Sequence, residues 1–321
     1  CHTELNTRPG YNGVDELRLP DFESAYGVDF SGAKLAGRCI WIARLALPKG
    51  LSATPLTERR RGGGAASCPR LISLDRLDRL CGTAERAVCL AGLVDLVSAS
   101  TAALWGFDCP FGLPVELFPE GAPWAEHFAF LAEYGDGDAY ACGLECIRRT
   151  KALPVALHRT ALHCRRQSDV AAKAPFDAFH YRMIYQTFFG MRDVVRPLAG
   201  TPGTAVLPFQ YRKLPKAKRV VVECCPASVL KKNELPHQNY KQPKGGPLAR
   251  KRVHTRHAIL GALGTRVRIS DHFRRVIMRN PGGDALDAVI AAVGALHGVR
   301  EADHRALAAH PRLTREGWMY V

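Results

Sequence analysis

Acidic residues stand at the ends of the apolar, strand-like segments of this 321-residue chain. Asp29 ends the first such segment, Asp108 ends a later one, and Glu223 ends a third. Asp284 and Asp287 lie three residues apart at the start of a helix-like segment, so they share one helix face. Strand ends at one edge of a sheet, with the first turn of an adjoining helix, are where α/β proteins build sites. The spacing therefore predicts one carboxylate cluster assembled from distant parts of the chain.

Carboxylates brought together in this way repel one another strongly in a low dielectric, so the cluster is costly unless a cation bridges it. Oxygen-only ligands favour Mg²⁺ or Mn²⁺ over zinc. Two such ions about 4 Å apart activate a water and stabilise the leaving oxygen in phosphodiester cleavage. We therefore predict a Mg²⁺- or Mn²⁺-dependent nuclease that hydrolyses DNA or RNA. The predicted metal ligands and catalytic residues are Asp29, Asp108, Glu223, Asp284 and Asp287.

Each acid also has an ordinary structural role open to it. Asp29 suits a cap for the turn that precedes Lys34, and Asp108 stands before Cys-Pro as a turn residue would. Asp284 suits the first turn of a helix because of the helix macrodipole. The shared position at predicted element ends favours the metal-binding interpretation over these separate ones.

Positive charge is concentrated in residues 212–279, which hold 18 Lys or Arg but only three acids, in a chain whose net charge is +15. A phosphate backbone is the natural partner of such a segment, because binding releases counterions. The alternative is a solvated surface that only aids solubility. We expect a nucleic-acid partner held by Lys231, Lys232, Lys241, Lys244, Arg250, Lys251 and Arg252.

The order of apolar segments and turns predicts the elements that carry the acids. Residues 24–29, 38–47 and 70–73 have the character of strands, Ser73 caps a predicted helix, and further strands follow at 101–108 and 218–223. Three strands form an antiparallel meander, and the helix crosses over to a parallel neighbour. The fold class expected is α/β, with a mixed five-stranded sheet and flanking helices.

The chain divides into a core and additions to it. We expect a loose arm over residues 1–23, a core formed by 24–114 and 216–300, and a tail over 301–321. Residues 115–215, rich in aromatic, His and Arg residues, are predicted to be a large, mostly helical insertion that covers one side of the core. Within it, 179–195 is predicted to be helical.

Four motifs link the chain to a known family: Gly27–Lys34, Trp105–Pro114, Val222–Pro226 and Gly283–Ala288. They resemble those of the domain of unknown function 429 family, usually described as a predicted nuclease with a ribonuclease H-like fold. The resemblance covers about residues 24 to 298, and the stretch from Arg165 to Leu198 is similar to the family's insertion.

That resemblance implies a ribonuclease H-like core in which Asp29, Asp108 and either Asp284 or Asp287 are metal ligands, with Glu223 as a further candidate. The final Asp-x-x-Asp-Ala is also similar to the end of RuvC-type Holliday-junction resolvases. In those enzymes a glutamate often stands at the second acidic position, where this chain has the shorter Asp108. The departure leaves open whether one metal or two bind.

Two other function classes compete with a nuclease. Gly27–Lys34 also resembles the first phosphate loop of actin- and hexokinase-like phosphotransferases, but those enzymes need two such cores, and 321 residues are few for that. The other class is a catalytically silent nucleic-acid-binding module that keeps the fold. Metal-dependent cleavage separates the nuclease from both.

Eleven cysteines are scattered through apolar stretches, where a reduced thiol packs as a small hydrophobe. Structural zinc is an alternative for one loose group of residues. This group comprises Cys142, Cys146, His158, His163 and Cys164. No apolar run approaches the ~20 residues that cross a bilayer, and the first residues lack a secretory signal pattern, so we expect a cytoplasmic protein without membrane association.

Overall fold

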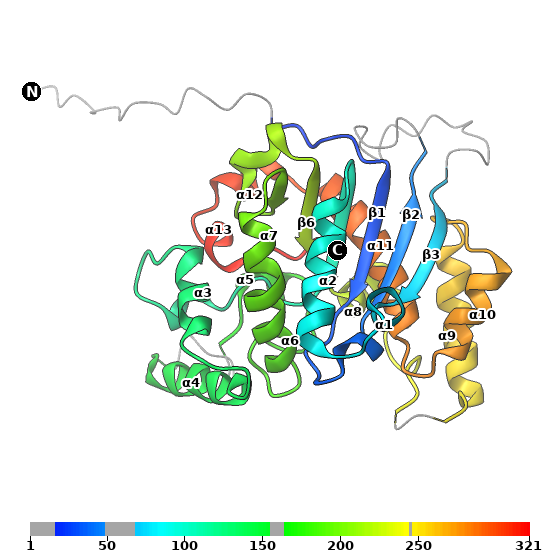
Figure 1. Ribbon diagram of the computed structural model, residues 1–321, viewed down its shortest axis with the longest axis horizontal. Helices are drawn as coiled ribbons and strands as arrows, with labels where there is room; N and C mark the ends of the chain where they lie inside the picture. The colour runs from blue at the N-terminus through cyan, green and yellow to red at the C-terminus, as the bar shows by residue number, and fades with distance from the viewer. Residues whose placement is uncertain (1–16, 49–67, 155–163, 244–245) are drawn as a thin grey trace, which may run out of the picture.

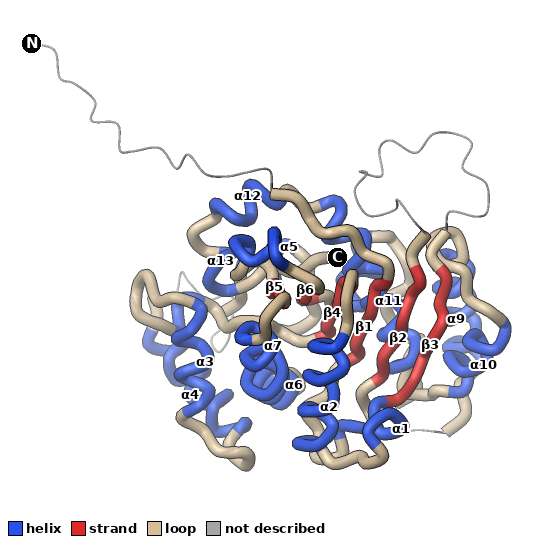
Figure 2. The backbone as a smooth tube through the Cα atoms, turned by 45° about the horizontal axis from the view of Figure 1, so that its top comes forward, coloured by secondary structure: helices blue, strands red, loops and turns tan. Residues whose placement is uncertain are grey.

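The computed structural model describes residues 17–48, 68–154, 164–243 and 246–321. They form an α/β protein around one mixed six-stranded sheet in the order β3-β2-β1-β4-β6-β5 (Figures 1 and 2). The strands are β1 (Ser24–Asp29), β2 (Trp41–Ala46), β3 (Arg70–Arg76), β4 (Ala103–Asp108), β5 (Thr204–Val206) and β6 (Arg219–Glu223). The first three are antiparallel neighbours, whereas β1, β4, β6 and β5 run parallel.

The sheet has one strand more than the five predicted. The three-residue β5 lies inside the segment predicted to be a helical insertion, and it pairs with β6 from Thr204 opposite Arg219. Its brevity explains why the sequence pattern did not reveal it. The predicted helix that begins at Ser73 is also wrong at its start, because β3 continues to Arg76.

Helices cover both faces of the sheet (Figure 1). On one face lie α8 (Pro226–Lys232), α9 (Arg250–Leu263), α10 (Asp271–Arg279) and the long α11 (Asp284–Glu301). On the other lie α1 (Leu77–Cys81), α2 (Arg86–Ala99), α6 (Ile184–Phe189), the π-helical turn Gly190–Val195 and α7 (Arg196–Gly200). The break between α1 and α2 falls at Gly82, whose φ of 72° ends α1 in the left-handed region.

Two hydrophobic cores result, one on each face of the sheet. Because side chains alternate along a strand, Ala25 and Leu104 belong to the core under α11, whereas Val28 and Phe107 belong to the core under α2 and α6. This alternation decides below which strand-end acids can meet.

Helix α11 lies unusually close to the sheet. A Cβ atom on Gly27 would come within 2.0 Å of the Ala288 carbonyl oxygen, and one on Gly106 within 2.4 Å of the Ala295 Cβ. The glycines at the middle of β1 and β4 therefore allow α11 to pack directly on the two central strands. This packing fixes the position of the start of α11 relative to the two strand ends.

The region predicted as an insertion is mostly helical, as expected, and adds α3 (Trp124–Ala132), α4 (Ala139–Ala152) and α5 (Gln167–Ala171). Its last helices pack on the sheet itself, so it completes the second core instead of standing apart from it. Within the predicted helix over 179–195, the helical part begins at Ile184.

The end of the chain is also part of the fold. Residues predicted to be a tail form α12 (His304–Ala309) and α13 (Leu313–Glu316). The Tyr320 N–H then donates to the Glu223 carbonyl at 2.9 Å, which ties the last residues to the end of β6. Across the described ranges, no helix has both the length and the apolar character that crossing a membrane requires.

Candidate functional site

Asp29 and Asp108 lie side by side. Each is the last residue of its strand, and the two are register partners between the parallel strands β1 and β4. Each lies two residues after a glycine that contacts α11, Gly27 in β1 and Gly106 in β4. Because alternate residues of a strand share a face, both aspartate side chains belong to the face on which α11 packs. Asp29 is 8% exposed and Asp108 is half-buried. The structure thus brings together the first two acids of the predicted cluster.

The start of α11 adds two further acids. Gly283, with φ of 92°, adopts the left-handed conformation just before the helix, and the Asn280 side chain accepts a hydrogen bond from the Ala285 N–H at 3.1 Å. Asp284 is half-buried there and Asp287 is only 1% exposed. The charges of both bear on Asp29.

A lysine lies among these acids. The Lys241 ammonium forms an ion pair with Asp287 Oδ2, and the Tyr240 hydroxyl donates to Asp287 Oδ1 at 3.0 Å. Asp287 is therefore held on both oxygens. Lys241, predicted as a contact for nucleic acid, is half-exposed, and its ammonium also belongs to the carboxylate cluster. Nothing in the basic segment of the sequence distinguished it from its neighbours.

Burial and mutual repulsion perturb the cluster. Burial raises the pKa of Asp29 well above its usual value, Lys241 opposes this rise, and the charges of Asp287, Asp284 and Asp108 add to it. Burial, and next the charge of Asp287, raise the pKa of Asp108 to about 8. Burial also raises the pKa of Asp284. Four acids with one ammonium make a site that favours additional positive charge.

Glu223 lies on the other face of the sheet from this cluster, although its charge adds to the rise in the pKa of Asp108. It is the register partner of Phe107 and not of Asp108. It therefore shares a face with Phe107 and Val221, whose side chains belong to the core on the opposite side of the sheet. A displacement of one residue along a strand reverses the face of its side chain. The prediction that Glu223 is a ligand in the same site as Asp29 and Asp108 therefore disagrees with its orientation.

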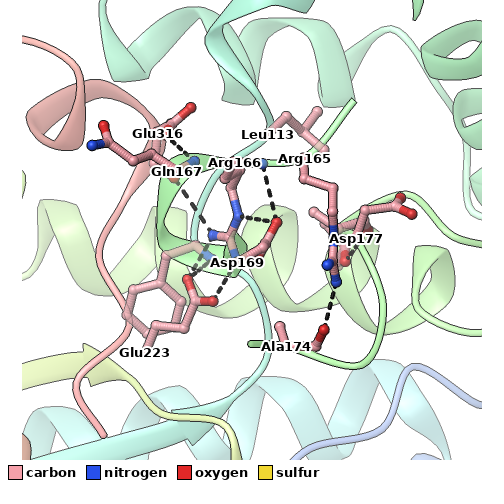
Figure 3. Close-up of polar contacts among 12 residues, drawn as sticks. Leu113, Arg165, Arg166, Gln167, Asp169, Ala174, Asp177, Glu223 and Glu316 are labelled. Atoms are coloured by element: carbon pink, nitrogen blue, oxygen red, sulfur yellow. Dashed lines mark hydrogen bonds and ion pairs between the residues drawn. The ribbon is translucent and has the colours of Figure 1, made fainter. Parts of the chain in front are cut away.

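Glu223 instead pairs with Arg166 in a buried, closed cluster (Figure 3). The Arg166 guanidinium donates to both Glu223 oxygens, at 2.5 and 2.8 Å, and to Asp169 Oδ1 at 2.6 Å. Glu223 Oε2 also accepts from the Phe111 N–H at 2.9 Å. Arg166 is fully buried, Asp169 is 1% exposed and Glu223 is 2% exposed. Burial raises the pKa of Glu223, and Arg166 opposes that rise.

A small cleft of about 40 Å³ lies between the two clusters. Its lining includes Asp108, Arg166, Glu223, Cys225 and Phe176. A larger cavity of about 320 Å³, lined in part by Ser168, Lys232 and Trp318, includes none of the clustered acids. Of these two cavities, the small cleft is the one that an acid of the carboxylate cluster lines.

A buried arginine fastens the segment that carries Lys241. Arg256 donates from Nε to the Tyr240 carbonyl at 2.7 Å and from its Nη atoms to the carbonyls of Ile277, Asn280 and Pro281 at 2.7–2.8 Å. The sequence placed Arg256 in a basic surface segment. The structure makes it an internal brace between Lys241 and the turn that begins α11.

The predicted nucleic-acid contacts fall into different groups. Lys231 donates to the Lys173 carbonyl at 2.7 Å, Lys232 pairs with Glu301 at 3.0 Å, and Arg252 donates to the Lys241 carbonyl at 2.7 Å. Arg250 and Lys251 are exposed at the start of α9. Lys244 lies outside the described residues.

The donor set at the cluster consists of oxygen atoms only, which is the chemistry that Mg²⁺ and Mn²⁺ prefer. As the side chains stand, with Lys241 on Asp287, no group of three or more His, Cys, Asp or Glu residues in the described ranges is arranged to hold a metal ion. For the alternative zinc group, Cys142, Cys146 and Cys164 are buried, whereas its two histidines lie outside the described residues.

Comparison with known proteins adds no relative. No family model matches the chain, and neither a curated protein nor a solved structure does.

Proposed function

We propose that this chain is a Mg²⁺- or Mn²⁺-dependent nuclease with a ribonuclease H-like core, of the kind described for the domain of unknown function 429. The strand order β3-β2-β1-β4-β6, antiparallel over the first three strands and parallel thereafter, supports that core, with β5 as an addition.

One observation carries the proposal. Asp29 and Asp108 end neighbouring parallel strands on the face that α11 covers, and α11 begins there with Asp284 and Asp287. Four acids share one ammonium, so the donor chemistry fits a divalent cation bound beside the lysine. Asp29, Asp108 and Asp287 would hold the ion, with Asp284 at its edge. A bound ion supplies Lewis acidity and lowers the pKa of water.

The residues of the chain would do the remaining work. In hydrolysis the water oxygen forms a bond to phosphorus, the bond to the leaving oxygen breaks, and a proton of the water ends on the leaving oxygen. The half-buried Asp108 and Asp284 leave the cluster accessible from solvent. The exposed Arg250 and Lys251 would hold the phosphate backbone beyond the scissile bond.

The two rival classes have less support. The described residues form a single sheet, whereas a phosphotransferase of the actin or hexokinase type needs two cores. A silent binding module has no use for a cluster in which burial and mutual repulsion raise the pKa values of Asp29 and Asp108.

Cleavage assays test the proposal. Purified protein would be incubated with labelled single-stranded, duplex and branched DNA and with RNA, in Mg²⁺, in Mn²⁺ and in EDTA. We expect cleavage that requires the metal and disappears in Asp29→Asn but not in Asp95→Asn, which changes an exposed acid on α2. Binding of the substrates without any cleavage, by folded protein with metal present, would instead support the silent module.

A further inference from the structure

We propose that Lys241 is a catalytic residue whose ammonium takes the place of one of the two cations of a two-metal nuclease site. The site would then bind one divalent cation, and Lys241 would neutralise charge on the scissile phosphate. This inference rests on the proposed function and states how many metal ions that function uses.

The position of the ammonium is the first support. It pairs with Asp287 Oδ2 while the Tyr240 hydroxyl donates to Oδ1, so it contacts an acid of the cluster directly. In a two-metal site each cation bridges protein carboxylates and phosphate oxygens. An ammonium that contacts the same carboxylates has three donor protons, of which those not used by Asp287 are available to a phosphate.

The rigid attachment of Lys241 is the second support. Its carbonyl accepts from Arg252, the Tyr240 carbonyl before it accepts from Arg256, and the Gln242 N–H after it donates to the Pro281 carbonyl at 2.9 Å. Three consecutive residues are thus tied to α9 and to the turn that begins α11. A surface lysine needs no such bracing, whereas a group that must meet a phosphate at a fixed place does.

Exposure gives the third support. The Asp287 side chain is 1% exposed, whereas the Lys241 side chain paired with it is 48% exposed. The pair therefore runs from the interior to the surface, with its positive end on the solvent side. This orientation places Lys241 between the buried acids and the incoming phosphate.

Charge balance favours one ion over two. Four ionised acids carry a charge of −4 at most. Lys241 contributes +1, and so does the Arg256 guanidinium beside Gly283, whose charge acts on Asp284 and Asp287. Without substrate, one divalent ion brings the positive total to +4, which balances the acids. Two ions would bring it to +6 and would place an ammonium beside two dications, where like charges repel.

The alternative is that the Lys241 ammonium only neutralises Asp287 in the metal-free site and moves away when two ions bind. The two cases differ in the number of Mn²⁺ ions bound per chain. If Lys241 is catalytic, the wild-type chain binds one Mn²⁺, and removal of the ammonium makes room for more cation while cleavage falls. If Lys241 only neutralises the metal-free site, the wild-type chain binds two Mn²⁺, and removal of the ammonium leaves the cleavage rate unchanged or raises it.

The test uses the full chain without nucleic acid, and Mn²⁺ as the probe. Bound Mn²⁺ per chain would be counted by electron paramagnetic resonance and calorimetry for the wild type, Lys241→Met and Lys241→Gln. Lys151→Met serves as the control because Lys151 is exposed on α4, away from the cluster. Circular dichroism would establish that each variant is folded. Cleavage rates would then be measured at saturating Mn²⁺.

We expect one Mn²⁺ per wild-type chain, at least one per Lys241 variant, and a kcat about 10²- to 10³-fold lower in both Lys241 variants, the loss typical of one charge-stabilising donor. Two Mn²⁺ per wild-type chain, or wild-type kcat in a folded Lys241 variant, would overturn the inference and leave the nuclease proposal standing. Neither Mn²⁺ binding nor cleavage by the wild type would overturn both.

Discussion

Two charged clusters lie near the same edge of the sheet, and they differ in charge balance. The Arg166 cluster sets one guanidinium between Asp169 and Glu223, both almost fully buried, with each guanidinium nitrogen hydrogen bonded. The carboxylate cluster has Asp29, Asp108, Asp284 and Asp287 for the one ammonium of Lys241. The first is closed and has little need of a ligand, whereas the second is half open and has an excess of negative charge.

This contrast separates a structural use of acids from a functional one. A buried pair with good geometry holds a unique arrangement, and its disruption is costly. An unbalanced group costs stability in the absence of a ligand, and such groups are concentrated at functional sites.

The largest effect on stability is expected for Arg166→Met. This change leaves the carboxylates of Glu223 and Asp169 buried without their partner and should lower the free energy of unfolding by about 3–5 kcal/mol. Arg165→Met is the matched control, because the half-buried Arg165 donates to the Ala174 carbonyl, and loss of such a hydrogen bond costs about 1 kcal/mol. Urea denaturation of both variants checks this, and equal losses would contradict the distinction.

Metal binding should stabilise the protein through the open cluster alone. At a free Mn²⁺ concentration of 100 times Kd, the free energy of unfolding should rise by about 2.7 kcal/mol. Asp108→Asn should abolish the gain, since it removes a ligand, whereas Asp169→Asn should keep most of it. Thermal melts with Mn²⁺ and with EDTA measure both, and a gain that survives Asp108→Asn would place the metal elsewhere.

The pH dependence of the free energy of unfolding, measured without metal, should show the electrostatic cost of the carboxylate cluster. The pKa of Asp108 rises from 3.8 to about 8 on folding, so in that range the folded state holds a proton that the unfolded chain has lost. The free energy of unfolding should therefore fall as pH rises. Burial lowers the pKa of His127 to about 3, which gives the opposite slope below its ordinary value of 6.5.

The window from pH 6.5 to 8 isolates the carboxyl groups from that opposing effect. Denaturation in EDTA across this window should give a smaller slope for Asp108→Asn than for the wild type. Identical slopes would mean that the Asp108 carboxyl loses its proton at its ordinary pH in the folded protein.

The smallest effect is expected at the start of α9. Replacing Arg250 and Lys251 together by Gln should weaken nucleic-acid binding similarly for all sequences. The slope of log K against log salt should become shallower by about 2, one unit for each phosphate group that the variant no longer neutralises. Fluorescence anisotropy at several salt concentrations measures this slope, and an unchanged slope would remove α9 from the interface.

Much of this arrangement follows from the sequence. Strands ending at Asp29 and Asp108, and a helix beginning at Asp284, were predictable because apolar alternation and turn residues mark these elements directly. The meander and the parallel crossover follow from element order. What the pattern did not give was β5, since three residues carry too little periodicity.

The face on which Glu223 lies was not predicted, and the alternation of side chains along the strand explains why. Strand-end position alone places an acid at the right edge, but alternation along the strand decides the face. Phe107, not Asp108, is opposite Glu223, and no local sequence feature specifies that register. The contact of Lys241 with Asp287 and the burial of Arg256 could not be predicted for a related reason, since clustered basic residues look alike in the sequence until tertiary contacts distinguish them.

The most direct measurement compares the two clusters in one assay, with Asp108→Asn and Glu223→Gln tested for Mn²⁺-dependent cleavage beside the wild type. If the open cluster performs the chemistry, Asp108→Asn stays folded and loses cleavage, whereas Glu223→Gln is less stable but cleaves below its melting temperature. Full cleavage by folded Asp108→Asn, with loss of cleavage in folded Glu223→Gln, would contradict the assignment of function to the carboxylate cluster.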